Sequence, residues 1–294
     1  MKEKDPRECP ACNSRERRLI GEKNGFEIFV CADCSTLYTG HVPAADETEN
    51  YDEYYSESNL TVPEFVRTRV SEIVSGFSKY RRTGNFLDIG FGAGTVLDIA
   101  SEQGWKVSGL EVSKPAVDRA RMRGFDVFHG GLSDAGYAAG QFDVITSSEI
   151  LEHLPDPIGD LKEIARILRP GGLFWATTPS ARSLSFRLLK LEWSVLSPPE
   201  HIQLYSRRGA SLMLESAGFS SVKFKTFGIN PAEISDHYRS RKGDNQPFNR
   251  VEAAYKLNES LTRSPIRKLV KGGLNEALSV LGIGDSLKIY AKTK

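Results

Sequence analysis

The stretch FLDIGFGAG, Phe86–Gly94, decides the fold of this chain. Its apolar residues predict a buried strand, which ends in three closely spaced glycines and opens directly into a helical pattern. Gly90, Gly92 and Gly94 permit a tight turn with positive φ and let a ligand approach the backbone closely. We therefore expect a nucleotide-binding turn between a strand and a helix.

An acidic residue follows this turn at the distance expected for ribose recognition. Glu111 comes seventeen residues after Gly94, within a second apolar strand over Lys106–Val112. A carboxylate at that place accepts hydrogen bonds from both hydroxyls of a ribose. The spacing departs from the dinucleotide fingerprint G-x-G-x-x-G, because Thr95 stands where the third glycine belongs. The pattern is instead acid-x-G-x-G-x-G, with Asp88 as the acid.

This combination of a glycine turn and a later acid resembles the first two motifs of class I S-adenosylmethionine-dependent methyltransferases. The resemblance implies that S-adenosylmethionine is the cofactor and that Leu132 flanks its adenine. The residues expected to bind the cofactor are Asp88, Gly90, Gly92, Gly94, Glu111, Leu132 and Ser147.

The other apolar segments alternate between helical and strand periods. They predict a lead-in helix over 62–80, helices over 114–123, 158–168 and 207–217, and strands over 125–128, 142–146, 173–177, 222–227 and 286–293. Alternation of this kind indicates an α/β protein with a doubly wound parallel sheet. With the resemblance, it predicts a Rossmann-like methyltransferase sheet of seven strands, mostly parallel, with the last strand antiparallel.

The four cysteines form two C-x2-C pairs with eighteen residues between the pairs: Cys9, Cys12, Cys31 and Cys34. This spacing matches four-thiolate zinc sites, so we expect a small zinc ribbon whose folding energy comes from a structural Zn²⁺. Four thiolates leave no open coordination position for catalysis. Two disulfides would need a secreted protein, and a redox pair would need a surrounding βαβ pattern.

The expected division is a zinc ribbon over 1–45, a linker and lead-in helix over 46–85, and a methyltransferase domain over 86–294 with a helical insertion over 228–285. The net charge is only +1, so composition supplies no general attraction to nucleic acid or anionic lipid. No apolar run reaches the length of a signal peptide or a membrane span, and we expect a cytoplasmic protein.

The insertion contains a basic amphipathic stretch over 263–281, in which lysine and arginine accompany aliphatic residues. Such a stretch suits peripheral contact with a membrane surface. A helix that covers the sheet, or one that forms a dimer contact, has the same pattern. The oligomeric state stays open.

Two loops carry a glutamate–histidine pair to the edge where ligands bind in open α/β sheets, beyond the carboxyl ends of the strands. One reads SSEILEHLPDP over 147–157, and the other reads PPEHIQLYS over 198–206. With ILRPGGLFWATTPS and ESAGF, these runs resemble ubiquinone-type O-methyltransferases. Combined with the amino-terminal zinc module, they also resemble nucleotide-sugar C-methyltransferases.

This closer resemblance implies that Glu200 and His201 form the catalytic pair and that His153 lines the same pocket. It also implies that Tyr54 or Tyr55 covers the pocket. Methyl transfer is an in-line displacement, and a hydroxyl or enolisable carbon needs a base that titrates near neutrality, as histidine does. His201 is the first candidate for that base and His153 the second.

The expected reaction is O- or C-methylation of a small molecule, such as a sugar, a polyketide, a quinone or a lipid-linked precursor. One alternative is an RNA base methyltransferase that grips nucleic acid with the ribbon. The balanced charge of the ribbon and the absence of an N-P-P-[FYW] tetrapeptide in the loop after 142–146 disfavour it. A second alternative is a protein that binds the cofactor without catalysis.

Overall fold

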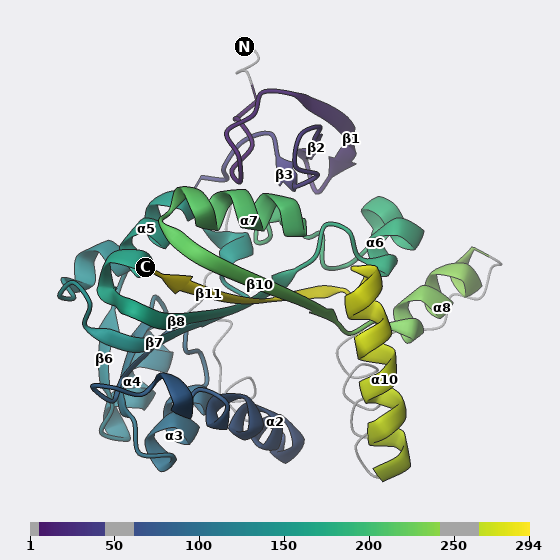
Figure 1. Ribbon diagram of the computed structural model, residues 1–294. Helices are drawn as coiled ribbons and strands as arrows, with labels where there is room; N and C mark the ends of the chain where they lie inside the picture. The colour runs from purple at the N-terminus through teal and green to yellow at the C-terminus, as the bar shows by residue number, and fades with distance from the viewer. Residues whose placement is uncertain (1–5, 45–61, 242–264) are drawn as a thin grey trace.

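The computed structural model describes residues 6–44, 62–241 and 265–294, whose strands form two sheets (Figure 1). The larger sheet has seven strands in the order β10-β11-β8-β7-β4-β5-β6. The strands are β4 (Asn85–Ile89), β5 (Lys106–Glu111), β6 (Asp126–His129), β7 (Phe142–Ser148), β8 (Leu168–Pro179), β10 (Phe219–Phe227) and β11 (Ser286–Thr293). Neighbouring strands from β6 to β8 pair in parallel, and β11 is antiparallel to both β8 and β10. The predicted fold class is confirmed.

Helices cover both faces of this sheet, as a doubly wound fold requires. The helices are α2 (Glu64–Ser75), α3 (Thr95–Glu102), α4 (Lys114–Met122), α5 (Pro157–Ile167) and α7 (Arg207–Ser216). Figure 1 shows α2, α3 and α4 on one face and α5 and α7 on the other. The central strands β4 and β7 are therefore buried on both sides along almost their whole length, including their polar residues Asp88, Asp143 and Thr146.

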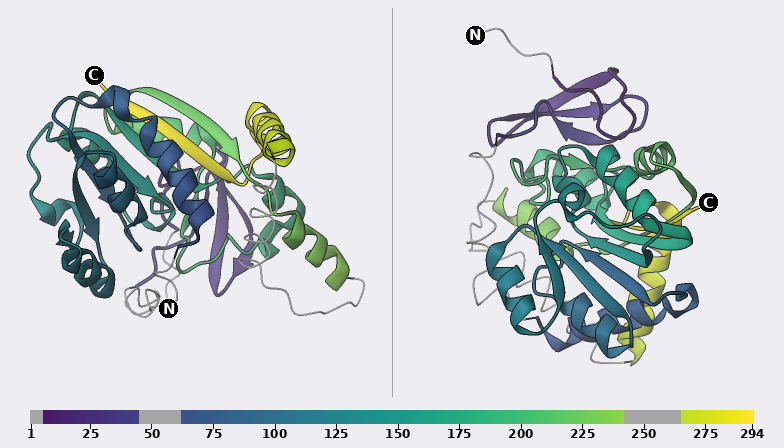
Figure 2. Two further views of the ribbon diagram at one scale, coloured as in Figure 1. Left: turned by 90° about the horizontal axis from the view of Figure 1, so that it is seen from below. Right: turned by 90° about the vertical axis from the view of Figure 1, so that its left-hand side faces the viewer.

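The amino-terminal ribbon forms the smaller sheet together with a strand from far along the chain. Its own strands are β1 (Arg17–Lys23), β2 (Phe26–Cys31) and β3 (Leu37–Thr39). The fourth strand, β9 (Gln203–Leu204), pairs antiparallel with β3. The ribbon thus lies against the side of the domain that carries α7 (Figures 1 and 2).

The segment RPGG at 169–172 lies inside β8, although the sequence predicts a turn there and a strand only from 173. The β7–β8 register shifts opposite Phe142 and Val144, so a bulge absorbs the segment. The Arg169 side chain donates to Asp143 and to the carbonyl of Tyr80. These bonds hold the chain on the sheet where its composition favours a turn.

The predicted helix over 62–80 is divided into α2 and a 3-10 turn, η1 (Ser78–Tyr80). Gly76 ends α2, and its amide donates to the Ile73 carbonyl at 3.1 Å. The division leaves Phe77 buried beneath the sheet.

The described part of the insertion is helical and comprises α8 (Pro231–Ser240) and α10 (Pro265–Leu281). α10 packs its buried Leu278 toward β10, while Leu269, Val280 and Leu281 are exposed. Figure 2 shows α10 at the outer edge of the sheet. Among the residues that the structure describes, no helix is long and apolar enough to span a bilayer. Peripheral membrane contact through 263–281 stays a prediction.

Candidate functional site

The glycine turn joins β4 to α3 at the carboxyl edge of the sheet. Gly90 has φ +70° and Gly94 has φ +76°, both in the left-handed region that favours glycine. A Cβ atom added to Gly90 would lie 2.2 Å from Cδ1 of Ile150, in the loop after β7. A larger residue at Gly90 would therefore have to move the Ile150 side chain and would be strained by the positive φ, so glycine suits this turn.

Glu111 ties the glycine turn to the loop after β5. Its Oε2 accepts from the Gly92 amide at 2.9 Å, and its Oε1 accepts from the amides of Val112 and Ser113 at 2.8 and 3.1 Å. The side chain is buried. A carboxylate has about four acceptor positions, so these three bonds fix its orientation and leave capacity for a ribose hydroxyl. The residues therefore fit the adenosyl group of S-adenosylmethionine.

The other predicted cofactor residues lie at the same edge or directly under it. Asp88 is buried and accepts from Thr146 Oγ1 at 2.7 Å. Burial raises the pKa of Asp88 to about 7, the Thr146 hydroxyl opposes the rise, and the charge of Glu111 adds to it. Leu132 is buried in the short η2 turn after β6, and Ser147 is buried near the end of β7.

His153 and His201 come from the two predicted loops and lie edge to face, with ring centroids 4.8 Å apart. His201 Nδ1 donates to the Val195 carbonyl at 2.5 Å, and His153 Nδ1 donates to the Glu200 carbonyl at 2.9 Å. A carbonyl only accepts, so each Nδ1 carries the hydrogen. For a neutral His201 ring, the basic lone pair therefore belongs to Nε2.

The two histidines differ in electrostatic setting. Burial lowers the pKa of His153 to about 4, and the neighbouring His201 lowers it further, against hydrogen bonds to the Glu200 and Glu149 carbonyls. His153 is thus neutral at physiological pH. The sequence predicts Glu200 and His201 as a catalytic pair. In the structure the His201 ring donates to the Val195 carbonyl, and the Glu200 carbonyl accepts from the His153 ring.

Glu152 also belongs to this group, and the sequence analysis did not single it out as a site residue. It is fully buried and accepts from Thr178 Oγ1 at 2.8 Å. Burial raises the pKa of Glu152 well above its usual value, and the nearby Glu149 raises it further. One ligand-type atom from each of Glu152, His153 and His201 lies within 4.8 Å of the others. The sequence signal that could have identified Glu152 is the glutamate–histidine pair, which occurs in both loops.

Hydrogen bonds from one backbone amide and one side-chain amide join the two histidine loops. The Ile202 amide donates to the Glu152 carbonyl at 3.0 Å, and Gln203 Nε2 donates to the carbonyls of Leu151 and Leu154 at 3.2 and 2.6 Å. These contacts explain why residues 48 positions apart in the chain, 153 and 201, share one site. The predicted cover by Tyr54 or Tyr55 lies outside the described residues.

Hydrogen bonds from the ribbon hold the segment that follows His201. The Thr39 amide donates to the Ile202 carbonyl at 3.0 Å, where β3 meets β9. Arg7 adds bonds from Nη2 to the Ile202 carbonyl at 2.8 Å and to Gln203 Oε1 at 3.1 Å, and from Nε to the Thr39 carbonyl at 2.9 Å. Burial lowers the pKa of Arg7 to about 10. The sequence carries no signal for this role, because arginine is common at exposed positions.

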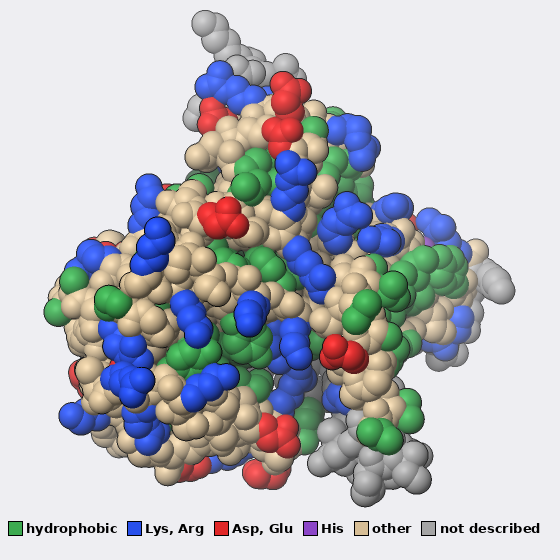
Figure 3. Space-filling model, in the orientation of Figure 1, with side chains coloured by type: hydrophobic (Ala, Val, Ile, Leu, Met, Phe, Trp, Pro, Cys, Tyr) green, Lys and Arg blue, Asp and Glu red, His purple; other side chains and the backbone are tan. Residues whose placement is uncertain are grey.

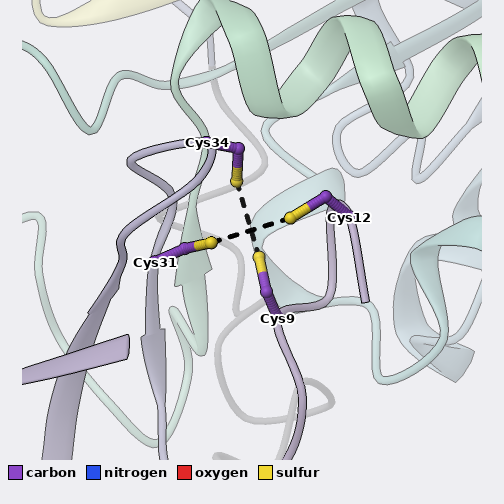
Figure 4. A group of neighbouring side chains, drawn as sticks. All are labelled: Cys9, Cys12, Cys31 and Cys34. Carbon is purple, nitrogen blue, oxygen red and sulfur yellow. Dashed lines mark hydrogen bonds between the residues drawn. The ribbon is translucent and has the colours of Figure 1, made fainter. Parts of the chain in front are cut away.

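The four cysteine sulfurs converge between the ribbon and the start of α7 (Figure 4). Cys9 and Cys34 are 3.6 Å apart between sulfurs, as are Cys12 and Cys31. A tetrahedron with zinc–sulfur bonds near 2.3 Å has sulfur–sulfur edges of about 3.8 Å. The cluster therefore fits a four-coordinate Zn²⁺ in size and in donor type.

This geometry agrees with the comparison to protein families. A family model described as a methyltransferase domain matches residues 62–223, more than half of the chain. The chain belongs to this family. It is an S-adenosylmethionine-dependent methyltransferase, as the glycine turn and Glu111 predict.

Sequence relatives of this methyltransferase include enzymes named ubiquinone biosynthesis O-methyltransferase. The one from Marinobacter nauticus is 26% identical over 189 residues, which cover 60% of this chain and 72% of the relative. The one from Aromatoleum aromaticum is 35% identical over 158 residues, which cover 49% of this chain and 68% of the relative.

A solved S-adenosylmethionine-dependent methyltransferase from Archaeoglobus fulgidus has the same fold. It superposes with a TM-score of 0.54 at 18% identity, covering 83% of this chain and all of the other. The likeness supports the architecture of the methyltransferase sheet.

We predict that Glu111→Gln weakens S-adenosylmethionine binding by roughly 10- to 100-fold, because an amide replaces a charged acceptor. Isothermal titration calorimetry measures the change. Glu215→Gln, at an exposed position on α7, serves as the control and should bind like the wild type. Normal affinity in Glu111→Gln would show that the ribose assignment is wrong.

Proposed function

We propose that this methyltransferase transfers the methyl group of S-adenosylmethionine to a hydroxyl oxygen of a small molecule, with His201 as the general base. The main support is the bond from His201 Nδ1 to the Val195 carbonyl, which assigns the basic lone pair to Nε2. The relatives named as O-methyltransferases favour oxygen as the acceptor atom. A quinone precursor, a sugar and a polyketide all offer such a hydroxyl.

S-adenosylmethionine, when bound, supplies an electrophilic methyl group. Nε2 of His201 accepts the hydroxyl proton while the acceptor oxygen forms its bond to the methyl carbon. The Val195 carbonyl holds the ring in the required tautomer and stabilises the imidazolium. His153, whose pKa burial lowers to about 4, stays neutral beside it and adds no positive charge. Glu152 lies behind the histidines and fixes the His153 loop through Thr178.

In this proposal the cofactor lies along the glycine turn, with its ribose at Glu111 and its adenine beside Leu132. Asp88 and Ser147 support the turn from β4 and β7. The four cysteines hold one structural Zn²⁺, and the ribbon serves to position the His201 segment rather than to take part in chemistry.

His201→Gln should reduce turnover by roughly 10²- to 10⁴-fold, the range expected when a general base is removed, with unchanged cofactor affinity. Radiolabelled S-adenosylmethionine and a fractionated cell extract measure the transfer. His237→Gln on α8 is the matched control. Full turnover in His201→Gln would contradict the proposed base.

The same assay distinguishes acceptor classes. Label in the small-molecule fraction supports the proposal, and the methylated atom follows from the purified product. Label in the RNA fraction, with binding that falls steeply as salt rises, would favour an RNA base instead. Cofactor binding without transfer to any fraction would favour a protein that does not catalyse methylation.

Cys12→Ser should lose a bound zinc that the wild type carries at one ion per chain, because three thiolates bind zinc less tightly than four. We expect a lower melting temperature for the ribbon and unchanged cofactor affinity, since the glycine turn lies in the other sheet. Elemental analysis and thermal unfolding test this. Asp33→Asn, in the exposed turn between Cys31 and Cys34, is the control. Zinc retained at full stoichiometry in Cys12→Ser would contradict the four-thiolate site.

Arg7→Ala should lower turnover and leave cofactor affinity unchanged, because it removes the bonds that join the ribbon to Ile202 and Gln203. Hydrogen exchange should become faster in the peptide over 198–206. Arg15→Ala, on the exposed side of the ribbon, should change neither quantity. Unchanged exchange over 198–206 in Arg7→Ala would show that the ribbon does not hold this segment.

A further inference from the structure

A basic pocket lies on the α2 face of the main sheet, apart from the glycine turn and the histidines. Its volume is about 410 Å³, and its polar lining comprises three basic residues, Arg69, Lys79 and Lys288, one acid, Glu72, and the tyrosines Tyr80 and Tyr290. Figure 3 shows lysine and arginine side chains gathered in the region between α2, α10 and the strands β10 and β11. The whole chain has a net charge of only +1, so this concentration arises from folding.

Two cations of this pocket share one aromatic ring. Arg69 Cζ lies 5.1 Å and Lys288 Nζ 4.8 Å from the ring centre of Phe227. Lys225 is the direct cross-strand partner of Lys288 in the β10–β11 ladder. Like charges placed directly opposite in an antiparallel pair destabilise a sheet. One cation over Phe227 would be an ordinary stabilising contact. Three cations this close, Arg69, Lys225 and Lys288, also repel one another.

Two of these cations, Arg69 and Lys288, are also partly withdrawn from water, whereas Lys225 is exposed. Burial, together with the charges of Arg69 and Lys225, lowers the pKa of Lys288 to about 8. Burial likewise lowers the pKa of Arg69, which Glu72 opposes. Within 6–44, 62–241 and 265–294, no ion pair includes Arg69, Lys225 or Lys288. Half-buried cations that repel one another are costly unless an anion binds among them.

We propose that this pocket binds the phosphate group of a small phosphorylated ligand. A planar guanidinium beside lysine ammonium groups suits a tetrahedral dianion, because several donors and charges meet it together. Tyr290 offers apolar surface to the organic part that carries the phosphate, while Lys79 and Lys292 lie over the Tyr80 ring with their Nζ atoms 5.4 and 4.9 Å from its centre. The pocket volume is in the range of small-molecule sites.

The pocket reaches from Tyr80 and Leu173, near the amino ends of β4 and β7, to Lys288, which lies nearer the carboxyl edge of the sheet. Lys288 lies directly opposite Thr177 of β8, and the Thr177 carbonyl accepts from the Glu149 amide in the loop that carries His153. The phosphate group has two candidate sources, the methyl acceptor and a separate ligand that acts on this loop through Lys288 and β8. The proposal that the pocket binds phosphate does not depend on the proposed O-methylation. Only the idea that the methyl acceptor carries this phosphate depends on it.

Calorimetry with inorganic phosphate and pyrophosphate, against sodium chloride at matched ionic strength, tests the site directly. We expect binding by the wild type that weakens at least 10-fold in Lys288→Gln and in Arg69→Gln. Lys106→Gln, at an exposed position of β5, should bind like the wild type. Absence of binding, or equal binding by all three variants, would overturn the proposal.

Thermal unfolding in phosphate-free buffer separates this site from a structural role. Lys288→Gln removes one of several repelling cations, so its melting temperature should equal or exceed that of the wild type. Added pyrophosphate should stabilise the wild type more than this variant. A lower melting temperature for Lys288→Gln, with the same pyrophosphate response as the wild type, would show a packing role and overturn the proposal.

Two kinetic arms then identify the source of the phosphate. Pyrophosphate that competes with the acceptor, with a raised KM for the acceptor in Lys288→Gln, supports a phosphorylated acceptor. Inhibition or activation that does not compete supports a separate ligand. Because binding is measured without methyl transfer, failure of the O-methylation proposal would leave the calorimetric result intact.

Discussion

The antiparallel pairing of β3 with β9 is the constraint on which the position of the His201 segment depends. Thr39 bonds Ile202 across 163 positions of the chain, and His201 directly precedes that contact. A strand pair has one register, so the ribbon determines where the His201 segment runs. Arg7 reinforces the same junction with buried hydrogen bonds. The ribbon and the His201 segment are therefore one structural unit, although Thr39 and Ile202 are 163 positions apart in the sequence.

Buried carboxyl groups organise the carboxyl edge of the main sheet in two different ways. Glu111 accepts three amide hydrogen bonds and so presents a fixed acceptor beside the glycine turn. Glu152 is buried beside Glu149, which raises its pKa, and it accepts from the Thr178 hydroxyl. The first arrangement suits ligand binding, and the second joins the loop after β7 to strand β8 next to His153. The surrounding amides and hydroxyls, rather than residue type, produce the difference.

Much of this arrangement follows from local sequence. The glycine turn and Glu111 predict the fold and the cofactor because backbone conformation and ribose recognition impose a fixed spacing. The cysteine pairs predict a metal cluster for a similar reason, since tetrahedral coordination needs two turns of defined geometry. The hydrogen-bond partner of the His201 ring could not be predicted in this way. Adjacent residues in extended chain point apart, and the Val195 carbonyl that bonds the ring has no signature in the sequence.

The sequence by itself determined the seven-stranded methyltransferase sheet, the position of the cofactor turn and the grouping of the four cysteines. These features depend on periodicity and on spacings within short segments. Only the tertiary structure decided that β9 closes the ribbon sheet, that His153 meets His201, and that Arg69 and Lys288 gather over Phe227. Such contacts join distant segments, and their geometry comes from sheet register and helix packing, which no local pattern encodes.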